Sequence, residues 1–270
     1  MKWYIILCVS CVFTSINANA SLLIAPTRIN FDSNDRVKEV LLVNNGNQPR
    51  TYRISWTEKK ALAQGGYEEI VDESNEVNAL SPFMRFSPRQ VRLAPGERQT
   101  IKLQLRKKSN MSASEYRSHL VFSALPIGDD GENSGDGIRL RAQVMINYSI
   151  PVLFHPRKGN VSISLANYGF VSRHDNGVDL ALTLKRSGDI SSFGRIEIYN
   201  GVREKQTQVG ILNNVHVYQE LDQAFLKVRI PNKDALDLSQ PLNVVYHGEK
   251  EHFGDIFFEE FLNNNLTKIN

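Results

Sequence analysis

Apolar and polar residues alternate with a period of two in many short segments of this chain. Residues 52–56, 101–105 and 178–184 each place an apolar side chain at every second position. This pattern is typical of half-buried strands, because successive side chains of a strand point to opposite faces of the sheet. No long segment repeats apolar residues at the i, i+3, i+4, i+7 spacing of an amphipathic helix. The sequence therefore predicts an all-β protein.

Turn-forming residues separate these segments at short intervals. Asn-Gly pairs occur at 45–46, 176–177 and 200–201, a Gly-Gly pair occurs at 65–66, and Pro95 and Gly96 predict the corner of a tight turn. Many short strands with such spacing predict β-sandwiches or a barrel. One immunoglobulin-like sandwich takes roughly 100 residues, so the chain has room for two immunoglobulin-like β-sandwich domains.

The first twenty residues have the composition of a secretory signal peptide. Lys2 precedes an apolar run over residues 3–16, and the small residues Ala18 and Ala20 follow it. We expect residues 1–20 to be removed, which predicts an exported protein with no membrane insertion after cleavage. An N-terminal membrane anchor is the alternative, but the run is shorter than the roughly 20 residues that a spanning helix needs.

Cysteine usage and charge exclude several classes of function. Both cysteines, Cys8 and Cys11, lie inside the predicted signal peptide, so the mature chain has no disulfide, no catalytic thiol and no cysteine zinc site. The 32 basic and 29 acidic residues give a net charge of +3, which is too small to favour nucleic-acid binding.

Sequence motifs of catalysis are missing as well. The chain has no P-loop, Rossmann, Gly-x-Ser-x-Gly or His-Glu-x-x-His motif, so we predict no enzyme and no cofactor. His247 and His252, with two glutamates between them, have the residue types of a metal site. A solvated, charged turn is the favoured interpretation, and no metal is predicted.

A change of composition near residues 155–159 predicts a domain boundary. There a strand-like run meets Pro156, two basic residues and a glycine, and a new alternation begins at Val161. We therefore expect one domain over residues 21–155 and a second over residues 156–270.

A segment rich in glycine and acidic residues, 127–137, predicts a mobile loop between two long strands, 116–125 and 138–154. A calcium-binding loop is the alternative. Counted from Asp130, however, the twelfth position is Arg141, where the EF-hand pattern needs glutamate. The sequence thus favours a hairpin loop.

An ordered set of motifs resembles the periplasmic pilus-assembly chaperones, the PapD-like family. The motifs are Ala25-Pro26-Thr27-Arg28-Ile29, residues 40–45, Tyr52-Arg53-Ile54-Ser55-Trp56, Phe86-Ser87-Pro88-Arg89, residues 93–101, Glu115-Tyr116-Arg117-Ser118-His119-Leu120 and Tyr148-Ser149-Ile150-Pro151-Val152. The resemblance covers residues 22–156 well and the remainder only by length and strand pattern. The run from Tyr116 to Leu120 looks most like the archaic branch of the family.

The resemblance implies two immunoglobulin-like domains in a boomerang arrangement. It further implies a chaperone of the periplasm that binds, folds and caps pilus subunits and delivers them to an outer-membrane usher without ATP. Subunits of such systems lack one strand, and the chaperone lends its own, which is a case of β-augmentation.

Aligning Pro156 with the interdomain proline of the family puts the donor strand at residues 138–146. Its apolar face consists of Ile138, Leu140, Ala142, Val144 and Ile146, which alternate with mostly polar residues. An ordinary strand that buries this face in its own core is the alternative. Strand donation is favoured because the face follows a mobile acidic loop.

The family also implies an anchor for the carboxylate at the C-terminus of the subunit. Arg28 matches the cleft arginine of the family, and a guanidinium can bind a carboxylate with two parallel hydrogen bonds. The second family residue, a lysine, would align with Pro151, so Arg117 is the replacement candidate, with His119 on the same strand face. The alternatives are a surface role for Arg28 and an internal salt bridge for Arg117.

An exposed donor strand would be prone to aggregation, so a self-capping homodimer is a further hypothesis. The rival function is a secreted two-domain adhesion or ligand-binding module with immunoglobulin-like sandwiches. That module would have no pilus-subunit partner and no dependence on Arg28.

Overall fold

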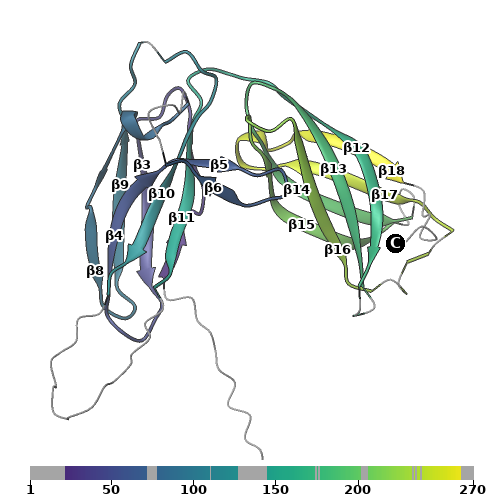
Figure 1. Ribbon diagram of the computed structural model, residues 1–270, viewed down its shortest axis with the longest axis horizontal. Helices are drawn as coiled ribbons and strands as arrows, with labels where there is room; N and C mark the ends of the chain where they lie inside the picture. Colours follow the sequence, from purple (N-terminus) through teal and green to yellow (C-terminus); the bar gives the residue numbers. More distant parts are fainter. Residues whose placement is uncertain are drawn as a thin grey trace, which may run out of the picture.

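The computed structural model describes residues 22–71, 78–109, 111–126, 145–173, 175, 177–201, 206–232, 234, 236–237 and 239–262. Within these ranges the chain forms strands and two short 3-10 segments, which confirms the predicted all-β class. Figure 1 shows two sandwiches joined at one end and set at an angle, which is the boomerang arrangement. In the described part of the chain, no helix is long and apolar enough to cross a membrane.

The first sandwich packs a four-stranded sheet against a five-stranded one. The four-stranded sheet has the order β1 (Leu22–Ala25), β3 (Val37–Asn44), β9 (Arg98–Leu105) and β7 (Met84–Ser87). The five-stranded sheet has the order β2 (Ile29–Phe31), β11 (Asn147–Phe154), β10 (Tyr116–Ala124), β4 (Arg50–Thr57) and β8 (Gln90–Leu93). The 3-10 segment η2 (Ser81–Phe83) precedes β7.

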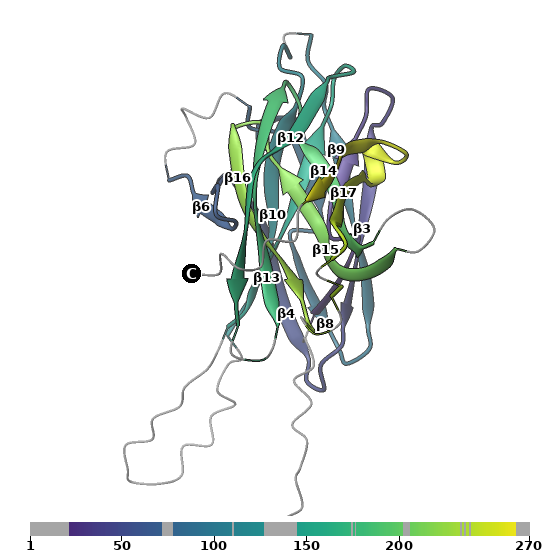
Figure 2. The same ribbon diagram turned by 90° about the vertical axis from the view of Figure 1, so that its right-hand side faces the viewer.

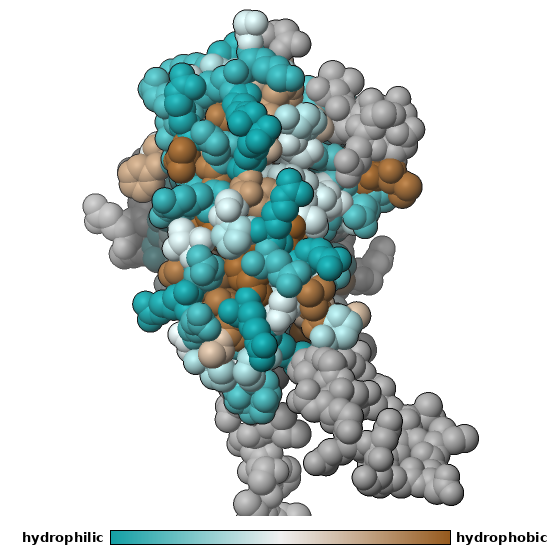
Figure 3. All heavy atoms as spheres, turned by 90° about the vertical axis from the view of Figure 1, so that its left-hand side faces the viewer, coloured by the Kyte–Doolittle hydropathy of each residue, from teal (hydrophilic) through white to brown (hydrophobic). Residues whose placement is uncertain are grey.

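Alternating burial on these strands explains why the two sheets form a sandwich. On β9, Ile101, Leu103 and Leu105 are buried while Lys102 and Gln104 are exposed. Each fully buried aliphatic side chain contributes roughly 1.5–3 kcal/mol, so one face of the strand is driven into the core. The face of this sandwich turned away from the second one is polar with small, interrupted apolar areas (Figure 3).

The second sandwich packs a three-stranded sheet against a four-stranded one. The first has the order β12 (Val161–Ser172), β13 (Val178–Gly188) and β16 (Gln223–Ile230). The second has the order β15 (Thr207–Val217), β14 (Ser192–Asn200), β17 (Leu242–Gly248) and β18 (Ile256–Leu262). The 3-10 segment η5 (Lys250–His252) lies between β17 and β18. A separate apolar core, which includes Leu180, Ile196 and Tyr246, fills this sandwich.

A hairpin of the first sandwich reaches the second one. It consists of β5 (Lys59–Ala61) and β6 (Tyr67–Glu69) and crosses between the sandwiches in Figure 1. In the orthogonal view of Figure 2, β6 lies beside β16, and the amide of Phe225 on β16 donates a hydrogen bond to the Ala63 carbonyl, 2.7 Å away. The sequence predicted only the Gly65-Gly66 turn, where both residues have positive φ.

Candidate functional site

A buried carboxylate joins the two sandwiches close to the connection between them. Glu115 is fully buried and accepts hydrogen bonds from the amide of Ser191 at 2.8 Å and from its hydroxyl at 2.5 Å. His155 lies 3.0 Å from the same carboxylate. Burial raises the pKa of Glu115, but the hydrogen bonds from His155 and Ser191 outweigh this effect and hold the pKa below its ordinary value. Both domains therefore contribute to one ionised network.

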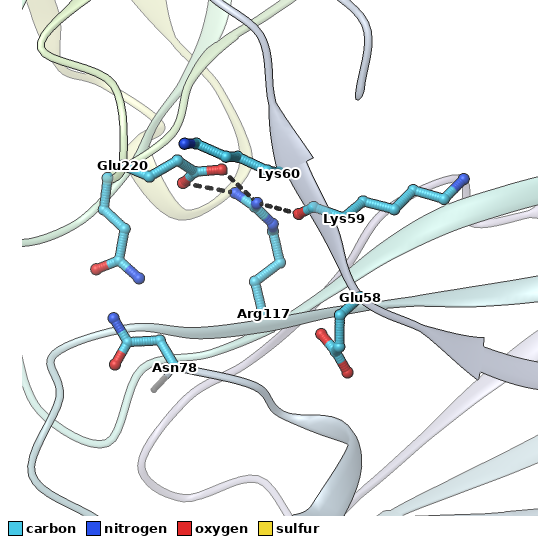
Figure 4. Close-up of a pocket in the computed structure, with 7 residues that line it drawn as sticks. Glu58, Lys59, Lys60, Asn78, Arg117 and Glu220 are labelled. Carbon is cyan, nitrogen blue, oxygen red and sulfur yellow. Dashed lines mark hydrogen bonds and ion pairs between the residues drawn. The ribbon is translucent and has the colours of Figure 1, made fainter. Parts of the chain in front are cut away.

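Arg117 lies in a second network between the domains, at the wall of a cavity of about 310 Å³. Its two terminal nitrogens donate to the Glu220 carboxylate, at 2.5 and 3.1 Å, and one of them also donates to the Lys59 carbonyl at 2.8 Å (Figure 4). The guanidinium stacks 3.9 Å from the ring centre of Tyr218. The structure therefore places Arg117 in an internal salt bridge, the arrangement that the sequence left open.

His119 lies on the same face of β10 as Arg117. Its ring packs 4.8 Å from the ring of Tyr67 on the hairpin, measured between ring centres. Neither ring nitrogen of His119 has a hydrogen-bond partner among the described residues. Burial, with the nearby charge of Arg117, lowers the pKa of His119 to about 3, so the ring is neutral at physiological pH.

Arg28 lies in the bend between β1 and β2 and reaches the second sandwich. Its side chain is only 6% exposed, and its Nη2 donates to Glu251 Oε1 at 2.6 Å. The guanidinium lies 4.6 Å from the ring centre of Phe193. Its Nε and Nη1 atoms are buried and have no hydrogen-bond partner among the described residues. Burial lowers the pKa of Arg28, but Glu251 outweighs this effect, so the guanidinium keeps its charge and two unused donors.

A cavity of about 200 Å³ lies beside Arg28. Lys250 and Pro151 also line it, so the position where the family lysine would align faces the predicted anchor. The hydroxyl of Tyr67 lies at its wall, 3.0 Å from the Tyr218 hydroxyl. No aspartate or glutamate lines this cavity among the described residues, so its charged groups are cationic.

The strand β11 has an open edge. β10 pairs with it along its whole length, from Asn147 to Phe154, but β2 pairs only with Val152–Phe154. Residues 147–151 therefore have no partner strand on their second side in the described part of the chain. Ile146 and Met145, which directly precede β11, are 51% and 52% exposed. Of the predicted donor residues, Ile138, Leu140, Ala142 and Val144 lie outside the described residues.

The sequence of the first domain decides the family. A family model described as "Pili and flagellar-assembly chaperone, PapD N-terminal domain" matches residues 21–160, more than half of the chain. This chain belongs to the PapD-like chaperone family. The family is one of chaperones and not of enzymes. By this match the chain is homologous to pilus-assembly chaperones. Its branch within the family stays a prediction.

Solved structures of several chaperones match this chain over most of its length. The YadV chaperone is 12% identical, with a TM-score of 0.46 over 90% of this chain and 100% of the other. A CsuC–CsuE chaperone–tip adhesion subunit complex from archaic Csu pili of Acinetobacter baumannii is 14% identical, with a TM-score of 0.42 over 90% and 97%. A structure of the SafA pilin of Salmonella enterica in complex with the SafB chaperone matches at 12% identity, with a TM-score of 0.43 over 90% of this chain and 96% of the other. A search of curated proteins finds no match.

Sequence reasoning misjudged the segment around η5 in this PapD-like chaperone. The prediction of a solvated, charged turn is wrong for Glu251 and His252, because Glu251 pairs with Arg28 and His252 is buried against the Ser191 carbonyl at 2.9 Å. No cluster of metal-ligating side chains occurs in the part of the chain that the structure describes. The sequence around η5 shows only a charged run after a buried strand. Such a run does not reveal that Glu251 pairs with Arg28, 223 residues away.

Proposed function

We propose that this protein is a periplasmic chaperone that binds, folds and caps pilus subunits by strand donation. It then delivers them to an outer-membrane usher without ATP. Family membership supports the chaperone role, and the open edge of β11 carries the proposal of strand donation. That edge directly continues the predicted donor face, so a subunit strand paired there would extend the five-stranded sheet.

Strand donation uses the ordinary chemistry of an open sheet edge. Main-chain hydrogen bonds provide affinity, and alternate side chains fill pockets of the partner. With a rise of about 3.4 Å per residue, residues 138–146 would span about 30 Å. Ile138, Leu140, Ala142, Val144 and Ile146 would enter the groove of a subunit that lacks one strand.

A fixed point is needed because a slip of one residue would turn the whole apolar face away from the groove. We propose that Arg28 is this point and binds the C-terminal carboxylate of the subunit. Its two unused, buried donors support this role. Arg117 remains the second candidate, but a subunit carboxylate there would have to displace Glu220.

The remaining parts of the proposal follow from the sequence. Residues 1–20 would direct export to the periplasm, with domains at residues 21–155 and 156–270. The free chaperone would cover its donor face in a self-capping homodimer. The proposal includes no cofactor, no metal and no nucleic acid.

The function is tested by co-expressing the protein with the genes of its own operon and recovering it from the periplasm. Native mass spectrometry of the wild type should show a one-to-one complex with a small secreted subunit. The amount of this complex should fall at least tenfold in Arg28→Ala. In Arg92→Ala, at an exposed position of β8, it should stay at the level of the wild type.

Arg28→Ala leaves Glu251, whose side chain is 12% exposed, without its partner, so the double variant Arg28→Ala with Glu251→Gln separates lost binding from lost folding. A folded double variant that still fails to bind supports the anchor. If the wild type captures no subunit although subunits are well expressed, the chaperone proposal is wrong and the adhesion or ligand-binding module takes its place.

A further inference from the structure

We propose that the carboxylate site is completed by the second domain, with Lys250 as the second cation beside Arg28. This inference rests on the proposed function, since the ligand is the terminal carboxylate of a bound chain. The site would therefore exist only while the two domains keep their relative position. Pro151, on the first domain, leaves the position of the family lysine without a charge.

The charge of the cavity beside Arg28 favours an anion. Arg28 and Lys250 both line it, and its described lining contains no carboxylate. His216 also lines it, but burial together with the charge of Arg28 lowers the pKa of His216 to about 4, so this ring is neutral at pH 7. Within this cavity the arginine and the lysine are then the charged groups that an entering ligand meets, whereas Glu39 and Glu251 line a second cavity that Arg28 and Lys250 also border. A cavity of about 200 Å³ admits a chain end and no folded domain.

The guanidinium of Arg28 is set up for one more acceptor. Glu251 binds only Nη2, through one carboxylate oxygen, while Nε and Nη1 are buried and find no hydrogen-bond partner in the part of the chain that the structure describes. Buried polar groups almost always have partners, so two unused donors on one side chain call for a ligand or ordered water. A carboxylate is the matching acceptor, because charge-assisted bonds from a guanidinium are short and strong. Glu251 holds the guanidinium in place.

The backbone at the cavity supports a binding role for Lys250. Lys250 and Asn214 are the two non-glycine residues with positive φ in the described part of the chain, at 57° and 56°. Both line the cavity beside Arg28. Asparagine tolerates this conformation, but lysine adopts it rarely. Strained backbone of this kind clusters at ligand sites, where the surrounding structure holds it.

The side chain of Lys250 is available for a ligand. Lys250 is exposed, and its ammonium group makes no ion pair or hydrogen bond with any described residue. Its neighbours on the same segment are engaged, because Glu249 pairs with Arg195 and Glu251 pairs with Arg28. Lys250 is therefore the free cation of η5, and it lines the same cavity as Arg28.

The test is an NMR titration of the full mature chain with a defined probe. The probe is N-acetyl-alanyl-phenylalanine with a free carboxylate, and its C-terminal amide is the control ligand. The Arg28 Nε resonance should shift on saturable binding of the acid, and the amide should bind at least tenfold more weakly. Lys250→Gln should weaken binding of the acid five- to tenfold, and Lys250→Arg should restore most of it. Lys227→Gln, at an exposed position of β16, should bind like the wild type.

Equal binding of the acid by the wild type and Lys250→Gln would overturn the inference. So would failure of the acid to shift Arg28 in the wild type. The titration and the subunit-capture experiment can give opposite results, so the two proposals can be refuted separately. If subunit capture depends on Arg28 but the affinity for the probe does not change in Lys250→Gln, the proposed function stands and Lys250 is not the second cation. If the affinity for the probe falls in Lys250→Gln but the wild type captures no subunit, the carboxylate site stands and the chaperone proposal is wrong.

Discussion

Arg117 in the first sandwich and Glu220 in the second form a two-point ion pair, with nitrogen–oxygen distances of 2.5 and 3.1 Å. The side chain of Arg117 is 9% exposed and that of Glu220 25%. One nitrogen of Arg117 also bonds the Lys59 carbonyl at the start of the hairpin. One guanidinium thus connects three parts of the molecule, so the relative position of the domains depends on it.

Removing the carboxylate of this pair should destabilise the protein. Glu220→Gln leaves the charge of Arg117 largely buried with weaker acceptors, and we expect a loss of about 1–3 kcal/mol in the free energy of unfolding. Urea denaturation measures the loss. Glu260→Gln, at an exposed position of β18, should change stability by less than about 0.5 kcal/mol. Equal losses in the two variants would show that the pair does not hold the domains.

Acid should destabilise the folded protein through His119. Burial and the charges of Arg117, Lys59, His216 and Arg28 lower the pKa of this ring from 6.5 to about 3. Below pH 6.5 the unfolded chain binds a proton at His119 that the folded protein excludes. The contribution of the neutral ring to the free energy of unfolding is therefore fully present above pH 6.5. It is lost progressively as the pH falls toward 3, by roughly 1.4 kcal/mol for each pH unit for one proton.

The variant His119→Gln removes the titrating ring of this position. The free energy of unfolding, measured in urea at pH 7.5, 6.0 and 5.0, should fall less steeply with acidification in the variant than in the wild type. An unchanged slope would mean that the folded protein protonates His119 readily, contrary to its buried place against Tyr67.

Close pairing of β14 with β17 requires glycine at position 194. A Cβ atom on Gly194 would lie 1.8 Å from the backbone oxygen of His247, so the strands would have to separate. Gly194→Ala should destabilise the second sandwich by at least about 3 kcal/mol. Gly169→Ala on β12 is the matched control, since its Cβ would meet nothing within 4 Å. Circular dichroism during thermal unfolding should show a large drop in Tm for the first variant alone.

Local pattern was sufficient for the fold class but not for the site. The alternation at Ile101, Leu103 and Leu105 places these side chains in the core as predicted, and Gly96 has the positive φ of the predicted turn. These features depend on neighbours in the sequence. The partner of Arg28 is Glu251, 223 residues away, and periodicity carries no information about such a contact.

The resemblance to a family made Arg28 a candidate anchor and left Arg117 as the candidate for its missing lysine, but the surroundings of both come largely from the second domain. The motifs cover residues 22–156, whereas Glu220, Lys250 and Glu251 lie beyond them. The segment around Lys250 has the composition of a solvated turn. Only the packing of η5 against the first sandwich turns it into a wall of the cavity.

Strand donation is tested most directly by the two residues that directly precede the open edge of β11. Ile146 and Met145 are exposed to nearly the same extent, 51% and 52%. They are successive residues of the predicted donor strand, and successive residues of a strand point to opposite faces. In periplasmic co-expression followed by native mass spectrometry, Ile146→Asp should reduce the subunit complex at least tenfold. Met145→Asp should keep it within about twofold, and both variants should stay folded. Equal retention of the complex by the two variants would contradict donation of this strand face to a subunit.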